Sequence, residues 1–101
     1  MIIYNVTTKV DHSIADSWLD WLKTEHIPDL ISTGCFTHAV ILCLLETDDT
    51  EGCTYAVQYH TESKDLYNQY IEKYAELMRK KAIDKWENKF IAFRSLMEVV
   101  N

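Results

Sequence analysis

Glycine and proline are scarce in this chain of 101 residues, which has two glycines, Gly34 and Gly52, and one proline, Pro28. Loops that cradle phosphate groups need several closely spaced glycines, so the usual nucleotide-binding loops are excluded. The first residues lack the basic start and long apolar stretch of a signal peptide, and the longest apolar run, 39–45, is too short to span a bilayer. We therefore expect a soluble, cytoplasmic protein with no membrane segment.

Metal-ligand patterns are absent as well. The three cysteines include no C-x-x-C pair, and the four histidines show neither H-x-x-x-H nor H-x-H spacing. These spacings are typical of zinc sites, and an odd number of cysteines does not complete a disulfide framework. We expect reduced thiols, no metal and no cofactor.

Positive charge is the third shortage. Ten lysines and arginines stand against sixteen aspartates and glutamates, so the formal charge is −6 at pH 7. Binding to nucleic-acid phosphates depends on clustered cations, and we therefore expect no nucleic acid as a partner. Five of the cations fall within residues 79–89, where they complement the dipole of a helix C-terminus.

Apolar residues are plentiful: 48% of the chain is hydrophobic and 12% is aromatic, enough for one packed domain spanning residues 1–101. A helix is predicted from Ser13, in a sequence like a capping box, to Gly34, and a second begins at Ser63. Residues rich in β-branched and aromatic side chains predict strands over 2–10, 35–46, 54–60 and 89–100.

The resulting order β-α-β-β-α-β predicts an α+β, ferredoxin-like fold, a four-stranded antiparallel sheet with two helices on one face. The strand over 35–46 is apolar on both of its faces, apart from Thr37 and His38. We therefore expect it to be buried on both sides. No helix remains to cover the second sheet face, and an uncovered apolar face indicates a binding or dimer surface. We expect a homodimer that packs sheet to sheet.

The segment W-L-K-T-E-H-I-P-D-L, Trp21 to Leu30, is similar to the W…H-h-P-D segment (h, hydrophobic) of EthD-like proteins. With the predicted topology, the chain resembles the dimeric α+β-barrel superfamily, in which two such sheets form a barrel with the helices outside. Over essentially its whole length it resembles an uncharacterised bacterial family of that superfamily. The segments that carry this resemblance are T-E-H-I-P, T-G-C-F, Y-A-V-Q-Y, K-F-I-A-F-R and M-E-V-V-N.

The resemblance implies a ligand cleft between the helices and the sheet of each subunit. Superfamily members include cofactor-free monooxygenases, lactone isomerases and haem-degrading enzymes, besides members with no known chemistry. The haem-degrading members pair an asparagine on the first strand with a histidine on the second helix. Asn5 matches the first position, but residues 63–82 contain no histidine, so haem chemistry of that kind is not expected here.

His26 is the main candidate for chemistry. Pro28 has no N–H to bond the carbonyl of Thr24, so the helix should kink or restart there. Trp18, Leu22 and His26 are four residues apart, and His26 should therefore face the sheet or border its edge. Its imidazole is either aimed at a cleft or bonded to a backbone carbonyl near the kink, and the residues leave both interpretations open.

Four further residues complete the candidate cleft: Trp21 on the first helix, and Asn5, His38 and Arg94 within strand patterns. A buried polar group needs a partner, so each polar residue is either a ligand contact or a member of an internal network. Arg94 would pair a substrate carboxylate, or else Glu98 or a glutamate of the other subunit.

Two functions follow from these residues. The first is a homodimer that binds a small organic ligand between helices and sheet, as a cofactor-free oxygenase or isomerase of a small aromatic or polyketide-like compound. The alternative is a non-catalytic sensor or protein-interaction module, for which the cleft should be collapsed. RNA-recognition domains share the topology, but the stretch E-G-C-T-Y-A-V-Q-Y, which leads into the third strand, begins with an acidic residue and lacks their aromatic pattern.

Overall fold

A computed structural model describes all of residues 1–101. The strands are β1 (Ile2–Asp11), β2 (His38–Cys43), β3 (Gly52–Thr61) and β4 (Phe90–Glu98). The helices are α1 (Ala15–Trp21), α2 (Ile27–Ser32), α3 (Lys64–Lys73) and α4 (Ala75–Trp86). Two further turns are η1, a 3₁₀ turn at His12–Ile14, and η2, a π-helical turn at Leu22–His26.

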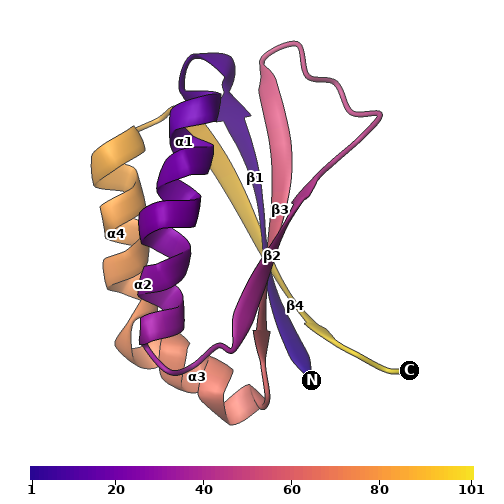
Figure 1. The fold of residues 1–101 in the computed structure, drawn as a ribbon, viewed down its shortest axis with the longest axis vertical. Helices are drawn as coiled ribbons and strands as arrows, with labels where there is room; N and C mark the ends of the chain where they lie inside the picture. The colour runs from indigo at the N-terminus through magenta and orange to yellow at the C-terminus, as the bar shows by residue number, and fades with distance from the viewer.

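The four strands form one sheet in the order β2-β3-β1-β4, and each strand runs antiparallel to its neighbours. All helices lie against one face of the sheet, and the other face carries none (Figure 1). The predicted ferredoxin-like α+β arrangement is confirmed. The two central strands, β1 and β3, are also the longest, with ten residues each.

The start of the first helical segment differs from the prediction. Asp11, at the end of β1, is the capping residue, because its Oδ1 accepts hydrogen bonds from the backbone N–H and the hydroxyl of Ser13 at 2.9 and 2.7 Å. The chain then makes the η1 turn before α1 begins, and α1 has no side-chain cap. The predicted capping by Ser13 is therefore wrong: Ser13 donates, and the acceptor lies two residues earlier.

The predicted interruption near Pro28 is confirmed, but it begins one turn earlier. The backbone N–H of Ile27 donates to the carbonyl of Leu22, which closes the five-residue π-helical turn η2. The helix then restarts as α2, with Pro28 in its first turn. A proline is well tolerated there, because the N–H groups of a first helical turn have no partner within the helix.

The second helical segment is also divided. Ser63 caps α3 as predicted, since its Oγ accepts from the N–H of Leu66 at 3.2 Å. At Tyr74 the backbone leaves helical values (φ −127°), and α4 starts in a new direction. The predicted single apolar face is therefore broken: Leu77 is 54% exposed although it follows the expected spacing.

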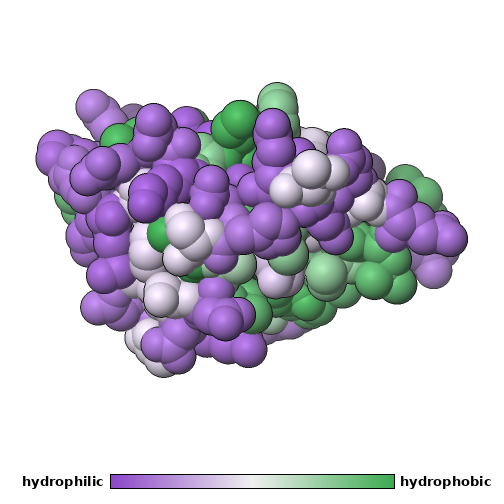
Figure 2. Space-filling view, turned by 90° about the horizontal axis from the view of Figure 1, so that it is seen from above, coloured by the Kyte–Doolittle hydropathy of each residue, from purple (hydrophilic) through white to green (hydrophobic).

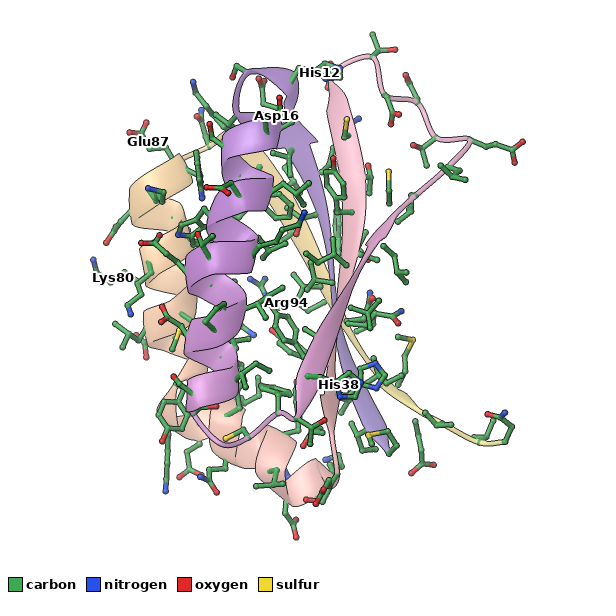
Figure 3. The ribbon with its side chains drawn as sticks, viewed as in Figure 1. His12, Asp16, His38, Lys80, Glu87 and Arg94 are labelled. Carbon is green, nitrogen blue, oxygen red and sulfur yellow. The ribbon has the colours of Figure 1, made fainter.

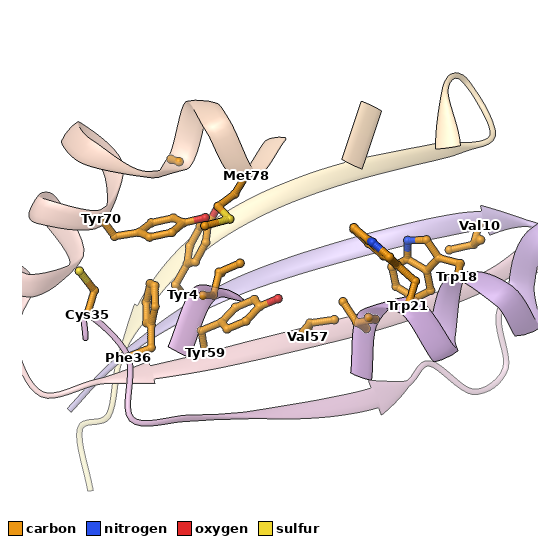
Figure 4. Close-up of a cluster of buried hydrophobic side chains, with 13 residues drawn as sticks. Tyr4, Val10, Trp18, Trp21, Cys35, Phe36, Val57, Tyr59, Tyr70 and Met78 are labelled. Carbon is orange, nitrogen blue, oxygen red and sulfur yellow. The ribbon is translucent and has the colours of Figure 1, made fainter. Parts of the chain in front are cut away.

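The core fills the space between the helices and the covered sheet face. Tyr4 lies at its centre, with ring centroids 5.4–6.0 Å from those of Phe36, Tyr59, Tyr67 and Tyr70. Figure 4 shows Tyr4, Phe36, Tyr59 and Tyr70 gathered at one end of this cluster, with Trp18 and Trp21 toward the other.

Strand β2 differs from the prediction of two-sided burial. It is shorter than expected and lies at the sheet edge, where Val40 and Leu42 are 40% and 42% exposed. Both pair with β3 residues on the face that no helix covers. Within one chain, the apolar residues on that side of β2 are left in solvent.

The two glycines differ in what a side chain would meet, which gives a matched pair of variants. A Cβ at Gly52 would lie 2.0 Å from the backbone oxygen of Val10, whereas one at Gly34 would meet nothing within 4 Å, at a φ of +79°. We expect Gly34→Ala to cost about 1–2 kcal/mol from left-handed backbone strain. Gly52→Ala should cost more, because backbone must move. Urea unfolding of both variants measures this, and equal losses would contradict it.

Candidate functional site

A cavity of about 50 Å³ lies between the helices and the covered sheet face. Its walls come from β1, β3, β4 and the helical segments on both sides, and 13 of its 17 lining residues are hydrophobic. The larger rings and polar side chains around it are Tyr4, Trp18, Trp21, His26, Tyr59, Tyr70, Arg79 and Arg94. No aspartate or glutamate lines it.

His26 occupies the last position of the π-helical turn η2. Its ring stacks on that of Trp21, with centroids 4.6 Å apart and an angle of 23° between the planes. Trp21 in turn meets Trp86 edge-on at 5.8 Å. The imidazole makes no hydrogen bond within the chain, so the predicted bond to a backbone carbonyl near the kink is not formed.

The π-helical turn sets the direction of His26. In a regular helix each residue advances about 100°, so His26 would lie about 80° from Trp18 and drift off the face shared by Trp18 and Leu22. A π-helical turn holds about one residue more than an α-helical turn. That extra residue brings His26 and Leu30 back to the inner face, where both line the cavity.

Burial lowers the pKa of His26 to about 4. The carboxylate of Asp29 opposes this shift, and the positive charges of Arg94 and Lys81 add to it. The imidazole is therefore neutral at physiological pH. A neutral, partly buried imidazole has one nitrogen that donates and one that accepts, and it is able to accept a proton or a hydrogen bond from a bound molecule.

Arg94 reaches the same cavity from β4. Its register opposite Val6 places it on the covered side of the sheet, and Figure 3 shows it between the helices and the strands. It forms no ion pair: the only two in the chain are Lys80–Asp84 and Lys81–Asp29. Glu98, the partner predicted within the chain, does not pair with it.

Asn5 and His38 lie on the opposite sheet face and do not share the cavity. The Nδ2 of Asn5 donates to the hydroxyls of Thr7 and Ser95, at 2.9 and 3.4 Å. His38 stacks on His60, its neighbour across the β2–β3 pair, with centroids 4.2 Å apart. Of the five predicted residues, the structure thus brings together three, Trp21, His26 and Arg94, at the cavity.

Arg79, on α4, belongs to the cavity but was not predicted. Its Nη2 donates to the hydroxyl of Tyr4 at 3.3 Å, while its Nε is buried without a partner. In the sequence it stands at the head of a cluster of lysines that reads as solvent-exposed charge at a helix end. Only its residue type could have drawn attention to Arg79, because it is the one arginine in a cluster whose other four cations are lysines.

Neither a metal centre nor a membrane segment emerges from the structure. No group of three or more His, Cys, Asp and Glu side chains is placed to hold a metal ion. None of the helices combines the length and the hydrophobicity that a bilayer crossing requires.

Comparison with known families decides the affiliation of the chain. The model of a domain of unknown function, DUF4286, matches residues 1–100. The chain belongs to the DUF4286 family. No curated protein matches this DUF4286 chain, and the family supplies no assigned activity.

Solved structures similar to this DUF4286 domain share its fold. A dimeric ferredoxin-like protein from an uncultured marine organism is 14% identical, with a TM-score of 0.71 over 100% of this chain and 96% of that one. An ethyl tert-butyl ether D (EthD) family protein from Bacillus halodurans C-125 is 8% identical, with a TM-score of 0.66 over 99% and 100%. The predicted resemblance to a family of unknown function is confirmed, and these two structures support the ferredoxin-like fold.

The low pKa of His26 predicts a pH-dependent stability. Between its folded pKa of about 4 and its ordinary 6.5, the unfolded chain binds a proton that the folded chain does not. The contribution of the neutral His26 to the free energy of unfolding is fully present above pH 6.5 and is lost as the pH falls toward 4. At pH 5 the loss should be about 2 kcal/mol.

Urea unfolding at pH 7 and pH 5, at one protein concentration, measures this loss. The variant His26→Phe keeps the ring and its stacking on Trp21 but does not titrate, so its stability should fall less between the two pH values. An equal fall in both proteins would show that His26 is protonated as readily in the folded chain as in the unfolded one.

Proposed function

We propose that this protein is a homodimer that binds a small organic ligand in the cavity between its helices and its sheet. The observation that carries the proposal is the neutral His26, which lines an apolar cavity and has no hydrogen-bond partner in the chain. A structural histidine near the kink would donate to a backbone carbonyl, and His26 makes no such bond. His26 instead keeps both nitrogens available.

The surroundings of His26 suit an aromatic ligand. The cavity wall offers rings from Trp18, Trp21, Tyr59 and Tyr70, which provide flat apolar contact area. Ligand sites in proteins commonly combine such a lining with a few polar groups that fix orientation. Here those polar groups are His26 and the guanidinium groups at the cavity wall.

The cavity must enlarge to admit such a ligand. A volume of about 50 Å³ has room for one or two water molecules at about 30 Å³ each. Ligand pockets commonly measure about 300–1,000 Å³. We expect this enlargement at the π-helical turn, because it places His26 at the cavity wall and such turns are frequent at functional sites.

His26→Phe tests this site, with Lys23→Gln, an exposed residue of the same turn, as the matched control. Phenol is the probe, and the indole and backbone amide signals of the cavity residues are followed by NMR. We expect phenol to shift the Trp21 indole signal in the wild type and in Lys23→Gln, and to bind His26→Phe at least tenfold more weakly. Equal binding by all three would remove His26 from the site.

The homodimer rests on the sheet face that no helix covers. Five apolar residues of the edge strands point to that side and are 38–68% exposed: Val40, Leu42, Ile91, Phe93 and Met97. Figure 2 shows apolar side chains gathered on the side of the molecule away from the helices. Exposed apolar patches of this kind on small proteins mark association surfaces, and a similar solved structure is described as dimeric.

Phe93→Glu tests the dimer, with Ile83→Glu as the control, since Ile83 is a comparably exposed apolar residue on the outer helix α4. Burying a carboxylate within a paired sheet face costs far more than placing it in solvent. Light scattering over a dilution series should give twice 11.9 kDa for the wild type and Ile83→Glu. Phe93→Glu should give a monomer, and a monomeric wild type would refute the dimer.

The small volume of the cavity favours a second candidate, a non-catalytic sensor or protein-interaction module. In that case the aromatic rings serve as core, and the uncovered sheet face carries the function. The two candidates separate in one measurement: the second predicts that small aromatic compounds leave the NMR signals of the cavity residues unchanged, while the dimer still forms.

A further inference from the structure

The chain contains two arginines and eight lysines. Both arginines, Arg79 and Arg94, line the cavity, whereas none of the lysines does. They come from elements on opposite walls, because Arg79 lies on α4 and Arg94 on β4. In a chain with a net charge of −6, the cavity is therefore lined by both arginines and by no aspartate or glutamate.

Neither guanidinium has an acidic partner. Arg79 bonds only to the hydroxyl of Tyr4, and its Nε is buried without any partner. An unsatisfied buried donor is costly, and the cost is greater for a charged group. Arg94 is exposed and makes no hydrogen bond within the chain. The fold thus retains two guanidinium groups that have no acidic partner within the chain.

The two groups line the same cavity as Tyr70. Burial raises the pKa of Tyr70, and the positive charges of both Arg79 and Arg94 oppose that rise. Arg94 also acts on His26, on the facing wall. Arg79, Arg94 and His26 all line the one cavity.

We propose that the cavity recognises a carboxylate, and that its ligand is a small aromatic or apolar carboxylic acid held by Arg79 and Arg94. The inference rests on the proposed ligand-binding function and specifies its ligand class. The guanidinium fork matches a planar carboxylate with two parallel hydrogen bonds, a geometry that lysine does not provide. The mostly apolar wall suits one charged end on an apolar body and not a highly charged ligand.

Benzoate and benzamide are the probes, because they have the same shape and differ in charge. Each is titrated at constant ionic strength and pH 7 into the wild type, Arg79→Gln, Arg94→Gln and the control Lys73→Gln, an exposed lysine with no ion pair. Binding is followed through the indole and arginine side-chain NMR signals. We expect benzoate to bind the wild type and the control at least tenfold more tightly than benzamide does.

In Arg94→Gln that preference should fall to about threefold or less while the fold is unchanged, because Arg94 is exposed and forms no ion pair within the chain. Arg79→Gln should act in the same direction. The swap Arg94→Glu should disfavour benzoate further and permit binding of benzylamine, a reversal that a merely structural arginine would not produce.

Other results would overturn the inference in distinguishable ways. Equal affinity for benzoate and benzamide in the wild type would leave the ligand site in place but refute its carboxylate specificity. Benzoate binding that survives both arginine substitutions would assign the anion to surface lysines. If none of phenol, benzamide and benzoate perturbs the cavity residues, the ligand-binding function fails together with the inference.

Discussion

The packing of aromatic rings between the helices and the two central strands is the interaction on which the rest of the structure depends. Tyr4 contacts rings from the segment before β2, from β3 and from α3, so it joins elements that are far apart in the sequence. Large aromatic side chains each bury about 150–250 Å². In a domain of 101 residues, a few such rings supply much of the apolar area that stabilises the fold.

This core also explains why the cavity is where it is. The tyrosine and phenylalanine rings gather at one end of the helix–sheet interface and the tryptophans gather toward the other (Figure 4). Flat rings of unequal size do not fill the interval between them completely, and both groups contribute to the cavity wall. The candidate site is thus a by-product of a core built from rings, into which polar groups have been placed from three sides.

The topology could be predicted from the sequence because strand and helix patterns alternate with short connections, which leaves few ways to pair four strands. The sheet order and the central position of β1 and β3 follow from it. The strand register could not be predicted, and it is the register that assigns Asn5 and His38 to one face and Arg94 to the other. A shift of one residue would exchange those faces.

Backbone irregularities were the other obstacle. The break at Tyr74 and the 3₁₀ turn before α1 have no strong sequence signal, because side-chain spacing reports a helical period and not its interruptions. Arg79 was missed for a related reason: in a sequence it looks like its lysine neighbours, and only the packing of α4 on the sheet distinguishes it.

The π-helical turn η2 decides the charge of the cavity. If the first helical segment were regular throughout, the residue at the inner position of that turn would be Glu25, and a carboxylate would face two arginines. The extra residue held in the turn exchanges Glu25 for His26 and leaves Glu25 in solvent. With a regular helix, the carboxylate of Glu25 would neutralise the arginines of the cavity. With the one extra residue in the turn, the arginines have no carboxylate in the cavity wall.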